Sequence, residues 1–475
     1  MREGEGMAMI TGGAPRNLQE VLDSVPSIPD LLYNNPTGTR IYPVVPPEFT
    51  NWRDEQRSWR ESVCLYDLSY HMTDLYVRGP DAFRLLSRLA INSFQGFEPG
   101  RAKQLVVCNP DGYVIGDGIL FYLERNVFQL VGRPSAHNWV EYHARTGGYD
   151  VELEWDQWSV TDPHRPRKIY RFQVQGPHAP ALLEKLSGGP LAGVKFFHMG
   201  WINIAGRKVR TLHHGMAGVA GAELFGPFAE GPEVKAAIVE AGKEFGLRQV
   251  GSRAYPSNAL DSGWIPCPLP AVYTSPPLRP YREWLPANGH EAVGSLGGSF
   301  YSRDVKDYYL TPRELGYGHI VKFDHDFVGR EALEARAKEA YRRRVTLVWN
   351  GDDVAATLAT FFTRPKGQQA KYIDLPVSQY ATWMYDRVMN RRGDVVGVSM
   401  WPGYSWNDAA MVSLAIVREE DGQPGTEVVV VWGEEGGGSR KPSVEPHVQT
   451  EIRATVAPVP FSDAARHYRA AVTHR

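Results

Sequence analysis

The stretch VGSRAYPSNALDSGWIPCPLP, residues 250–270, places a tyrosine and a tryptophan in a segment that prolines keep irregular. Tyr255 stands directly before Pro256, and prolines occupy every second position after Trp264 and Ile265. Helices and central strands both need the amide donors that proline lacks, so neither is expected after Trp264. A residue before proline favours extended geometry, which predicts a fixed direction for the Tyr255 phenol. The segment is therefore either a rigid aromatic wall of a pocket or a packed connector between domains.

Further residues that could do chemistry flank predicted strands. His71, in DLSYHMTDL, comes just before a strand, where a structural histidine is more common than a ligand-binding one. Arg133 ends a strand and precedes a proline, where it could hold a carboxylate through two hydrogen bonds or form a surface ion pair. His213 and His214 are adjacent and cannot share one face of a strand, and no third ligand has a suitable spacing, so no metal site is predicted.

A glycine-rich loop, GMAGVAGAELFGP at residues 215–227, leads into Glu223. Its spacing differs from the GxGxxG of dinucleotide-binding folds, and no strand–helix–strand unit with a ribose-binding acid follows, so neither NAD nor flavin is expected. The simple interpretation is a plain glycine loop. The alternative is that Glu223 accepts two hydrogen bonds from the N–C–N donor edge of a pterin or a guanidinium.

The elements that must position these residues change character along the chain. Up to Arg344, predicted helices alternate with strands and hairpins, and the clearest helices cover 52–63, 81–94 (with Asp81 as a possible cap), 134–146 and 231–247. Beyond it, short strands at regular spacing predict a β-barrel or sandwich. A helix over 331–344 would link the two parts. We therefore predict an α+β chain with one region at 1–340 and a C-terminal all-β domain, a barrel or a sandwich, at 341–475.

Composition excludes several classes of protein. The 475 residues carry 52 basic and 54 acidic side chains, a balance that predicts no nucleic-acid partner. The three cysteines, Cys64, Cys108 and Cys267, are odd in number and form no CxxC, which favours a reducing cytoplasm over a disulfide framework. No apolar run has membrane-spanning length, and the first residues lack the apolar core of a signal peptide. We expect a cytoplasmic protein without a membrane partner, either a monomer or a homodimer.

From residue 42 to residue 461 the sequence resembles the folate-dependent aminomethyltransferase family, also called the glycine-cleavage T-protein superfamily. The landmarks are YDLSYHM, DAFRLL, GYVIGDGIL, FQVQGPHA, GMAGVAGAELFGP and GDVVGVSMWPGYSWN. A more specific block, with GSRAYPSNALDSGWIP, YREWLPANG, GGSFYS and GYGHIVKFDHDFVGREALE, resembles the branch of tetrahydrofolate-dependent aryl O-demethylases that act on vanillate and syringate. The resemblance implies a clover-leaf of three domains around a central folate channel, the third being the C-terminal β-barrel at 341–475. Residues 1–340 would then form two interleaved α/β subdomains that bind folate and substrate.

The resemblance also implies roles for individual residues. Glu223 matches the family's pterin-binding carboxylate, and Gln173 matches a nearby glutamine. The residues that match the substrate pocket and the catalytic group are His71, Arg133, the proton donor Tyr255, the aromatic wall Trp264 and the further pocket tyrosine Tyr42. Tetrahydrofolate would accept the methyl group of a methoxylated aromatic acid, with neither metal nor flavin.

Chemistry supports this assignment, because methyl transfer from an aryl ether releases a phenolate. A tyrosine with an ordinary pKa near 10 is a roughly matched acid for that oxygen. Arg133 would anchor the substrate carboxylate, and could also orient Tyr255. The largest contribution would come from alignment of the reacting atoms, where entropy effects reach roughly 7–11 kcal/mol.

Two departures from the family pattern restrict the reaction and the substrate that we expect. Aminomethyltransferases carry paired aspartates where this chain has only Asp117, which argues against aminomethyl chemistry. Leu68 stands where vanillate demethylases are expected to have a glutamine, so we predict a substrate that is more methoxylated or lacks the para-hydroxyl. Two alternatives remain open: a methyltransferase of the same fold that uses a sulfonium or amine donor, and a non-catalytic folate-binding accessory protein.

Overall fold

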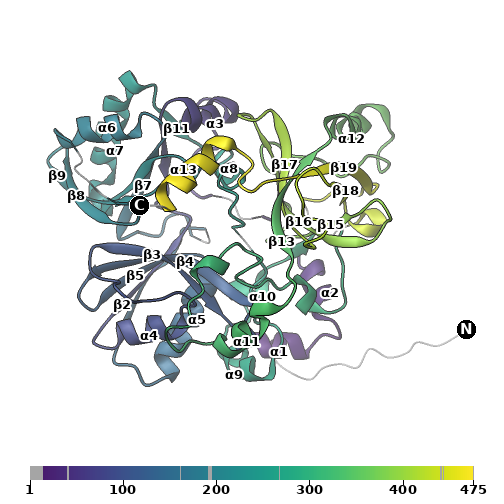
Figure 1. Ribbon diagram of the computed structural model, residues 1–475, viewed down its shortest axis with the longest axis horizontal. Helices are drawn as coiled ribbons and strands as arrows, with labels where there is room; N and C mark the ends of the chain where they lie inside the picture. The colour runs from purple at the N-terminus through teal and green to yellow at the C-terminus, as the bar shows by residue number, and fades with distance from the viewer. Residues whose placement is uncertain are drawn as a thin grey trace, which may run out of the picture.

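The computed structural model describes residues 14–39, 42–160, 162–190, 195–266, 268–438, 441 and 443–473. Cys267 and residues 1–13, where no signal peptide was predicted, lie outside this part of the chain. Two sheets and a barrel form three lobes around a common centre (Figure 1). The α+β class and the clover-leaf architecture are thus confirmed, while the boundary between residues 340 and 341 stays a prediction.

The first lobe is a six-stranded sheet with the order β11-β1-β7-β10-β9-β8, in which only β1 and β11 pair in parallel. Along β7 and β10, apolar residues such as Phe172 and Leu224 alternate with polar ones. The apolar face packs on α6 and α7, as period-two alternation requires. The elements are β1 (Cys64–Asp67), β7 (Ile169–Gln175), β8 (Met199–Ile204), β9 (Arg207–His213), β10 (Gly221–Pro227), β11 (Arg248–Val250), α6 (Ala179–Ser187) and α7 (Gly231–Gly242).

The second lobe is an antiparallel five-stranded sheet with the order β3-β4-β5-β2-β6, covered by two helices. It interleaves with the first lobe in sequence, because β2 to β6 lie between β1 and β7. The elements are β2 (Thr73–Arg78), β3 (Arg101–Cys108), β4 (Val114–Glu124), β5 (Val127–Gly132), β6 (Glu152–Asp156), α4 (Ala82–Leu89) and α5 (Pro134–Thr146).

The third lobe is a closed antiparallel barrel, β13-β17-β16-β15-β18-β19, as the family resemblance predicted. Its elements are β13 (Arg343–Trp349), α12 (Gly351–Thr363), β15 (Asp386–Met389), β16 (Val395–Ser405), β17 (Ala410–Val417), β18 (Glu427–Trp432) and β19 (Thr450–Ala457). The remaining helices and strands are α1 (Leu18–Asp23), α2 (Ile28–Asn34), α3 (Trp52–Glu61), α8 (Asn258–Ser262), α9 (Arg279–Trp284), α10 (His290–Val293), α11 (Arg330–Ala335), α13 (Asp463–Thr473), β12 (Leu296–Gly297) and β14 (Trp383–Met384).

Three local predictions were wrong in extent or detail. The helix expected at 81–94 ends at Leu89, because Ala90 is extended and forms a bridge with Val107 of β3. Asp81 precedes that helix but makes no side-chain cap, since its carboxylate binds Arg84. The linker helix expected at 331–344 covers only Arg330–Ala335 and continues as a short 3-10 helix, Arg336–Lys338. From Arg343 onward, pairing with β17 overrides helix propensity.

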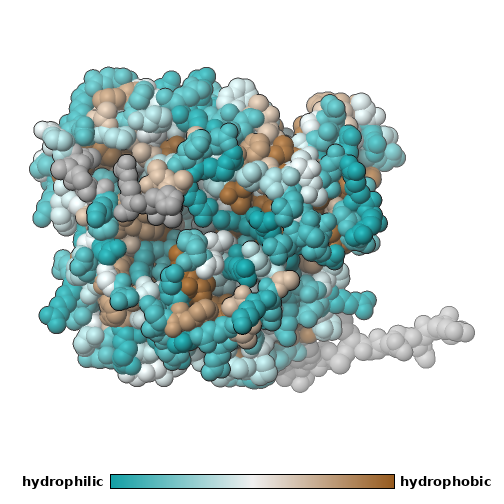
Figure 2. Space-filling model, in the orientation of Figure 1, coloured by the Kyte–Doolittle hydropathy of each residue, from teal (hydrophilic) through white to brown (hydrophobic). Residues whose placement is uncertain are grey.

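The surface is mostly hydrophilic, and on the face shown in Figure 2 apolar residues gather toward the middle, between the three lobes. Within the described residues, no helix combines the length and the apolar character needed to cross a bilayer.

Candidate active site

A cavity of about 560 Å³ lies where all three lobes meet. Its wall includes His71 from the turn between β1 and β2, Asp117 from β4, Glu223 from β10 and Trp401 from β16. The sequence-predicted residues that line it are Tyr42, Leu68, His71, Arg133, Glu223, Tyr255 and Trp264. The fold therefore brings together positions that are widely separated in the sequence.

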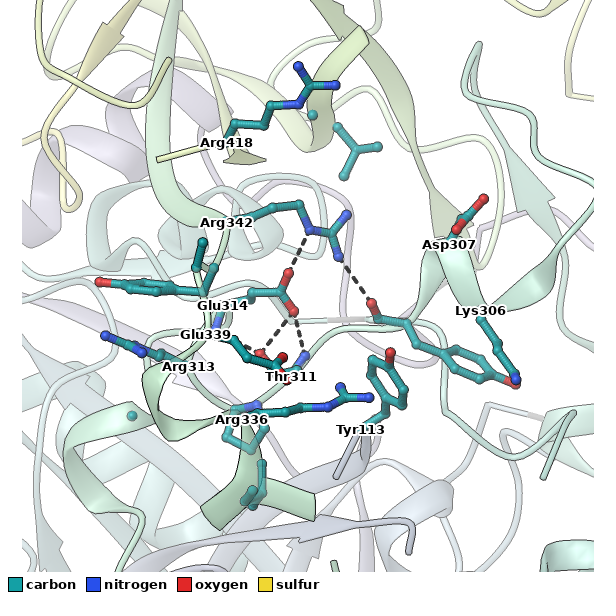
Figure 3. A pocket seen from close by; sticks show the side chains of 18 of the residues that line it. Tyr113, Lys306, Asp307, Thr311, Arg313, Glu314, Arg336, Glu339, Arg342 and Arg418 are labelled. Carbon is teal, nitrogen blue, oxygen red and sulfur yellow. Dashed lines mark hydrogen bonds and ion pairs between the residues drawn. The ribbon is translucent and has the colours of Figure 1, made fainter. Parts of the chain in front are cut away.

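A second cavity, of about 720 Å³, lies between the segment 306–342 and β16 (Figure 3). Although larger, its described lining contains none of the predicted site residues. Two of its cations already contact other lining residues: Arg342 binds Glu314 at 2.6 Å, and Arg336 lies over the Tyr113 ring at 4.3 Å. We therefore take the central cavity as the candidate site.

Tyr255 begins the 3-10 helix Tyr255–Ser257, which runs directly into α8. The prediction of extended geometry before Pro256 was wrong, because the Tyr255 amide donates to the Gly251 carbonyl at 3.1 Å and so starts a helical turn. Proline is tolerated there since the first helical positions need no donor. From this turn the phenol reaches the cavity, where burial raises its pKa above the ordinary value despite the nearby Arg133 charge.

His71 Nε2 lies 3.1 Å from the Tyr255 hydroxyl, and the Tyr42 ring packs on both side chains, with centroids 4.5 Å from His71 and 4.8 Å from Tyr255. Burial lowers the pKa of His71 to about 3, with further lowering by the charges of Arg133 and its neighbours. The imidazole is therefore neutral at ordinary pH. The cavity thus holds a compact cluster of one imidazole and two phenols.

Arg133 directly follows β5 and occupies the N-cap position of α5. Within the described part of the chain its guanidinium forms no ion pair, whereas the buried Arg167 and Arg171 are each held by carboxylates. An arginine that faces a cavity without a paired carboxylate is suited to bind an anionic ligand bidentately.

Glu223 is buried on the cavity face of β10 and carries an internal ion pair. Its Oε1 accepts from Arg171, and its Oε2 lies 3.2 Å from His214 Nε2. Burial raises the pKa of this carboxyl, but the Arg171 charge and the hydrogen bond with His214 outweigh it and hold the pKa at about 2. Because a carboxylate offers about four acceptor positions, about two remain for a ligand.

Comparison with known proteins identifies the family. Residues 35–267 match the model of the GCVT N-terminal domain. Syringate O-demethylase of Sphingobium sp. (strain NBRC 103272 / SYK-6) is 48% identical over 95% of this chain and 97% of its own length. The chain belongs to the T-protein superfamily, in its O-demethylase branch.

Other members of the T-protein superfamily are more distant. Sesamin methylene transferase of Sinomonas sp. (strain No.22) is 30% identical over 89% of this chain and 91% of its own. The crystal structure of the glycine cleavage system aminomethyltransferase T from Bartonella henselae is 18% identical, with a TM-score of 0.59 over 91% of this chain and 95% of its own. That structure supports the shared fold.

Gln173, which the family resemblance predicted at the folate site, is not among the residues that line the cavity. It is fully buried on β7, directly opposite Glu223 on β10. Its Nε2 donates to the His214 carbonyl at 2.8 Å, while its Oε1 has no hydrogen-bond partner among the described residues. The hydrogen bond from Gln173 therefore fixes the loop that carries His214, and a direct contact between Gln173 and folate stays a prediction.

Trp264 belongs to a hydrogen-bonded group that sequence reasoning did not foresee. Its Nε1 donates to the Tyr317 hydroxyl at 2.7 Å, and Asp117 Oδ2 accepts from Tyr317 and from Gln104 Nε2. Burial raises the pKa of Asp117, opposed by these donors. Tyr317 stands in the GYGHI motif, which was quoted as a landmark without a role. The aromatic wall is thus fixed in part by polar contacts.

The described residues contain no group of three or more His, Cys, Asp or Glu side chains arranged to hold a metal ion. Leu68 is buried at the cavity wall, and its amide donates to the Arg171 carbonyl at 2.8 Å. Its side chain therefore presents an apolar surface to a ligand at the position where a glutamine was expected in vanillate demethylases.

Proposed function

We propose that this protein transfers the methyl group of a methoxylated aromatic acid to tetrahydrofolate, giving the phenol and 5-methyltetrahydrofolate. The observation that carries the proposal is one cavity that combines Arg133, the His71–Tyr255 pair and the ionised Glu223. The 48% identity with syringate O-demethylase over 95% of the chain supports the same reaction.

The cavity fits tetrahydrofolate by its chemistry. Glu223 would accept hydrogen bonds from the pterin edge with the acceptor positions that Arg171 and His214 leave unused. Phe121 and Phe197 also line the cavity and would contact a flat ring. Bound tetrahydrofolate supplies a nucleophilic N5 that accepts the methyl group.

The residues of the chain would bind and orient the arene. Arg133 would hold its carboxylate, and Trp264 and Tyr42 would flank its ring. Alignment of the methyl carbon between the ether oxygen and the acceptor nitrogen would lower the barrier, since pre-paid orientation contributes up to roughly 7–11 kcal/mol. The apolar side chain of Leu68 favours a ring that carries a methoxy group on each side of its para oxygen over a ring that carries only one.

Tyr255 would protonate the ether oxygen as the carbon–oxygen bond breaks. In the overall balance the oxygen gains one proton and tetrahydrofolate N5 loses one, so no other reactant is needed. Because burial raises its pKa, Tyr255 is a weaker acid than an ordinary tyrosine. Its proton would therefore be transferred only as negative charge develops on the oxygen, which is when a general acid acts.

The buried free thiols of Cys64 and Cys108 are compatible with a reducing compartment, and we propose the cytoplasm as the location. A monomer or a homodimer remains our prediction for the oligomeric state.

The proposal is tested by anaerobic incubation of the pure protein with tetrahydrofolate and syringate, vanillate, veratrate or anisate, followed by mass spectrometry. The expected result is loss of one methyl group from an arene with matching formation of 5-methyltetrahydrofolate. Omission of tetrahydrofolate should abolish both products. If tetrahydrofolate binds but no arene loses a methyl group, the proposal fails, and sulfonium or amine donors and an accessory role come next.

A further inference from the structure

Arg171 is a buried charge that joins the two sheets behind the candidate site. It projects from β7 and is 2% exposed. Its guanidinium binds Glu223 of β10 in its own sheet and Asp74 of β2 in the other sheet, the latter at 2.9 Å. It does not line the cavity, so it acts on a ligand through wall residues that it contacts, and Glu223 is the charged one among them.

The same guanidinium packs against two aromatic rings. Its Cζ lies 5.1 Å from the centre of the Phe121 ring on β4 and 5.2 Å from that of Phe225 on β10. These rings are themselves 5.5 Å apart, at 78° to each other. Contact with both rings and ion pairs to two carboxylates leave the guanidinium little freedom, so it holds the Glu223 carboxylate in a fixed position.

Asp74 is itself anchored on the far side of Arg171. Its Oδ1 accepts from Gln129 Nε2 at 2.7 Å, and its Oδ2 accepts from Arg167 at 2.7 Å. Arg167 in turn pairs with Asp156 at 3.0 Å. The ion pairs therefore run without a break from Asp156 through both arginines to Glu223.

We propose that Arg171 is the positioning residue that keeps Glu223 ionised and directs its unused acceptor positions into the cavity. The proposal rests on the proposed function, since it treats Glu223 as the group that receives the pterin. Arg171 would act on tetrahydrofolate binding and leave the arene site unchanged.

The charge balance around Glu223 explains why this cation is needed. A buried carboxyl without a partner becomes neutral near physiological pH, and a neutral carboxylic acid loses acceptor capacity. The titratable and charged groups that face Glu223 are Arg171 from β7, His214 after β9, His71 from the β1–β2 turn and Tyr255 from its 3-10 helix, with Asp74 from β2 behind Arg171. Of these, the guanidinium is the one whose positive charge does not depend on pH.

The test compares Arg171→Gln with Arg167→Gln, which removes the other buried arginine of the network but no contact of Glu223. Dissociation constants for tetrahydrofolate are measured by anaerobic calorimetry between about pH 6 and about pH 9, a range over which an ordinary carboxyl stays ionised. For wild type and Arg167→Gln the constant should be nearly independent of pH. For Arg171→Gln the Glu223 pKa should rise, so binding should be weaker by about tenfold or more at the acidic end and recover as pH rises.

A steady-state assay supplies a second readout. In Arg171→Gln the KM for tetrahydrofolate should rise, while the KM for the arene stays near the wild-type value. Arg171→Lys keeps the charge but loses the planar guanidinium that reaches both Glu223 and Asp74, so it should weaken binding without introducing the pH dependence. If Arg171→Gln does not fold, the Lys variant and a Glu223→Gln variant carry the test, because both should weaken tetrahydrofolate binding with no slope against pH.

The possible failures are distinguishable. If wild type binds no tetrahydrofolate, the proposed function falls. If wild type binds it and Arg171→Gln shows unchanged affinity, or a loss that is equal at every pH, the positioning role is overturned while the proposed function stands. A pH-dependent loss in Arg167→Gln of the same size would also overturn it, because the effect would then belong to the network as a whole.

Discussion

The Nε2 atom of His71 lies 3.1 Å from the hydroxyl oxygen of Tyr255, inside a cavity where both groups are uncharged at ordinary pH. A phenol carries one proton, so the tautomer of His71 decides where that proton points. With hydrogen on Nε2, the imidazole donates to the Tyr255 oxygen and leaves the phenol proton for a ligand. With hydrogen on Nδ1, the phenol donates to His71 instead. The catalytic arrangement therefore requires the first tautomer.

Removal of the Tyr255 hydroxyl should lower the rate of the chemical step. Tyr255→Phe keeps the ring and its packing, and kcat should fall by about 10²–10⁴-fold, the contribution typical of a general acid. The KM for tetrahydrofolate should change little. Single-turnover formation of 5-methyltetrahydrofolate measures the effect directly.

Tyr66→Phe is the matched control for this change. The Tyr66 ring lies 5.5 Å from that of Tyr255, but its hydroxyl accepts from Gln175 at 3.1 Å and the residue does not line the cavity. It should retain most of the activity. Equal losses in both variants would show that packing, rather than proton donation, explains the result.

The pH profile should show no titration of His71. Burial lowers its pKa to about 3, so the imidazole is neutral above that pH, and the pKa of Tyr255 is raised, so its phenol stays protonated through the neutral range. With anisate or veratrate, which lack a phenolic proton, kcat/KM should be flat between about pH 5.5 and about pH 8.5, across the ordinary pKa of histidine.

The lowered pKa of His71 should also make the free energy of unfolding depend on pH. Between about pH 3, the folded value, and the ordinary pKa of about 6.5, the unfolded chain binds more protons at His71 than the folded chain does. The free energy of unfolding should therefore rise with pH over this window, and His71→Gln should reduce that slope. A wild-type inflection of kcat/KM near pH 6.5 that disappears in His71→Gln would refute the assignment of a neutral histidine.

Arg133 should act on the carboxylate of the substrate. Arg133→Gln should raise the KM for the aromatic acid by about 10- to 100-fold, since hydrogen bonds to charged groups contribute about 1.5–3 kcal/mol. A methoxyarene without a carboxylate should lose far less, and the ratio of kcat/KM for the two compounds isolates the interaction. If both compounds lose activity equally, Arg133 acts on something other than the carboxylate.

The sequence pattern predicted the lobes more reliably than the contacts within the site. The sequence indicated a strand and then a helix along 168–186 and a hairpin along 201–215, and regular strand spacing after Arg344 indicated an all-β domain, because these signals are local. The ends of the elements depended on tertiary pairing: the bridge from Ala90 to Val107 and the start of β13 at Arg343 overrode helix propensity.

Contacts between distant segments were beyond local reasoning. Glu223 was predicted to accept from a pterin or a guanidinium, and the structure pairs it with the guanidinium of Arg171, which the sequence did not single out. Gln173 donates to the His214 carbonyl. A partial signal did exist, because Arg171 stands between Tyr170 and Phe172 in the strand sequence IYRFQVQ, and an arginine that is buried in a sheet needs a charged partner. The identity of that partner followed only from the register that sets β7 against β10.

Leu68 should control which ring substituents the cavity accepts. Leu68→Gln restores the polar side chain expected in vanillate demethylases, and it should raise the ratio of kcat/KM for vanillate over syringate by about tenfold, the value of about one hydrogen bond. Leu68→Met is the control, because it keeps an apolar surface of similar volume and should leave the ratio unchanged. Since Leu68 is only 2% exposed, a glutamine there needs a partner, so the thermal midpoint of unfolding should fall without ligand and recover with vanillate. An unchanged ratio in a folded Leu68→Gln variant would assign selectivity to another part of the wall, such as Trp264 and Asp117, which line the cavity and are joined through Tyr317.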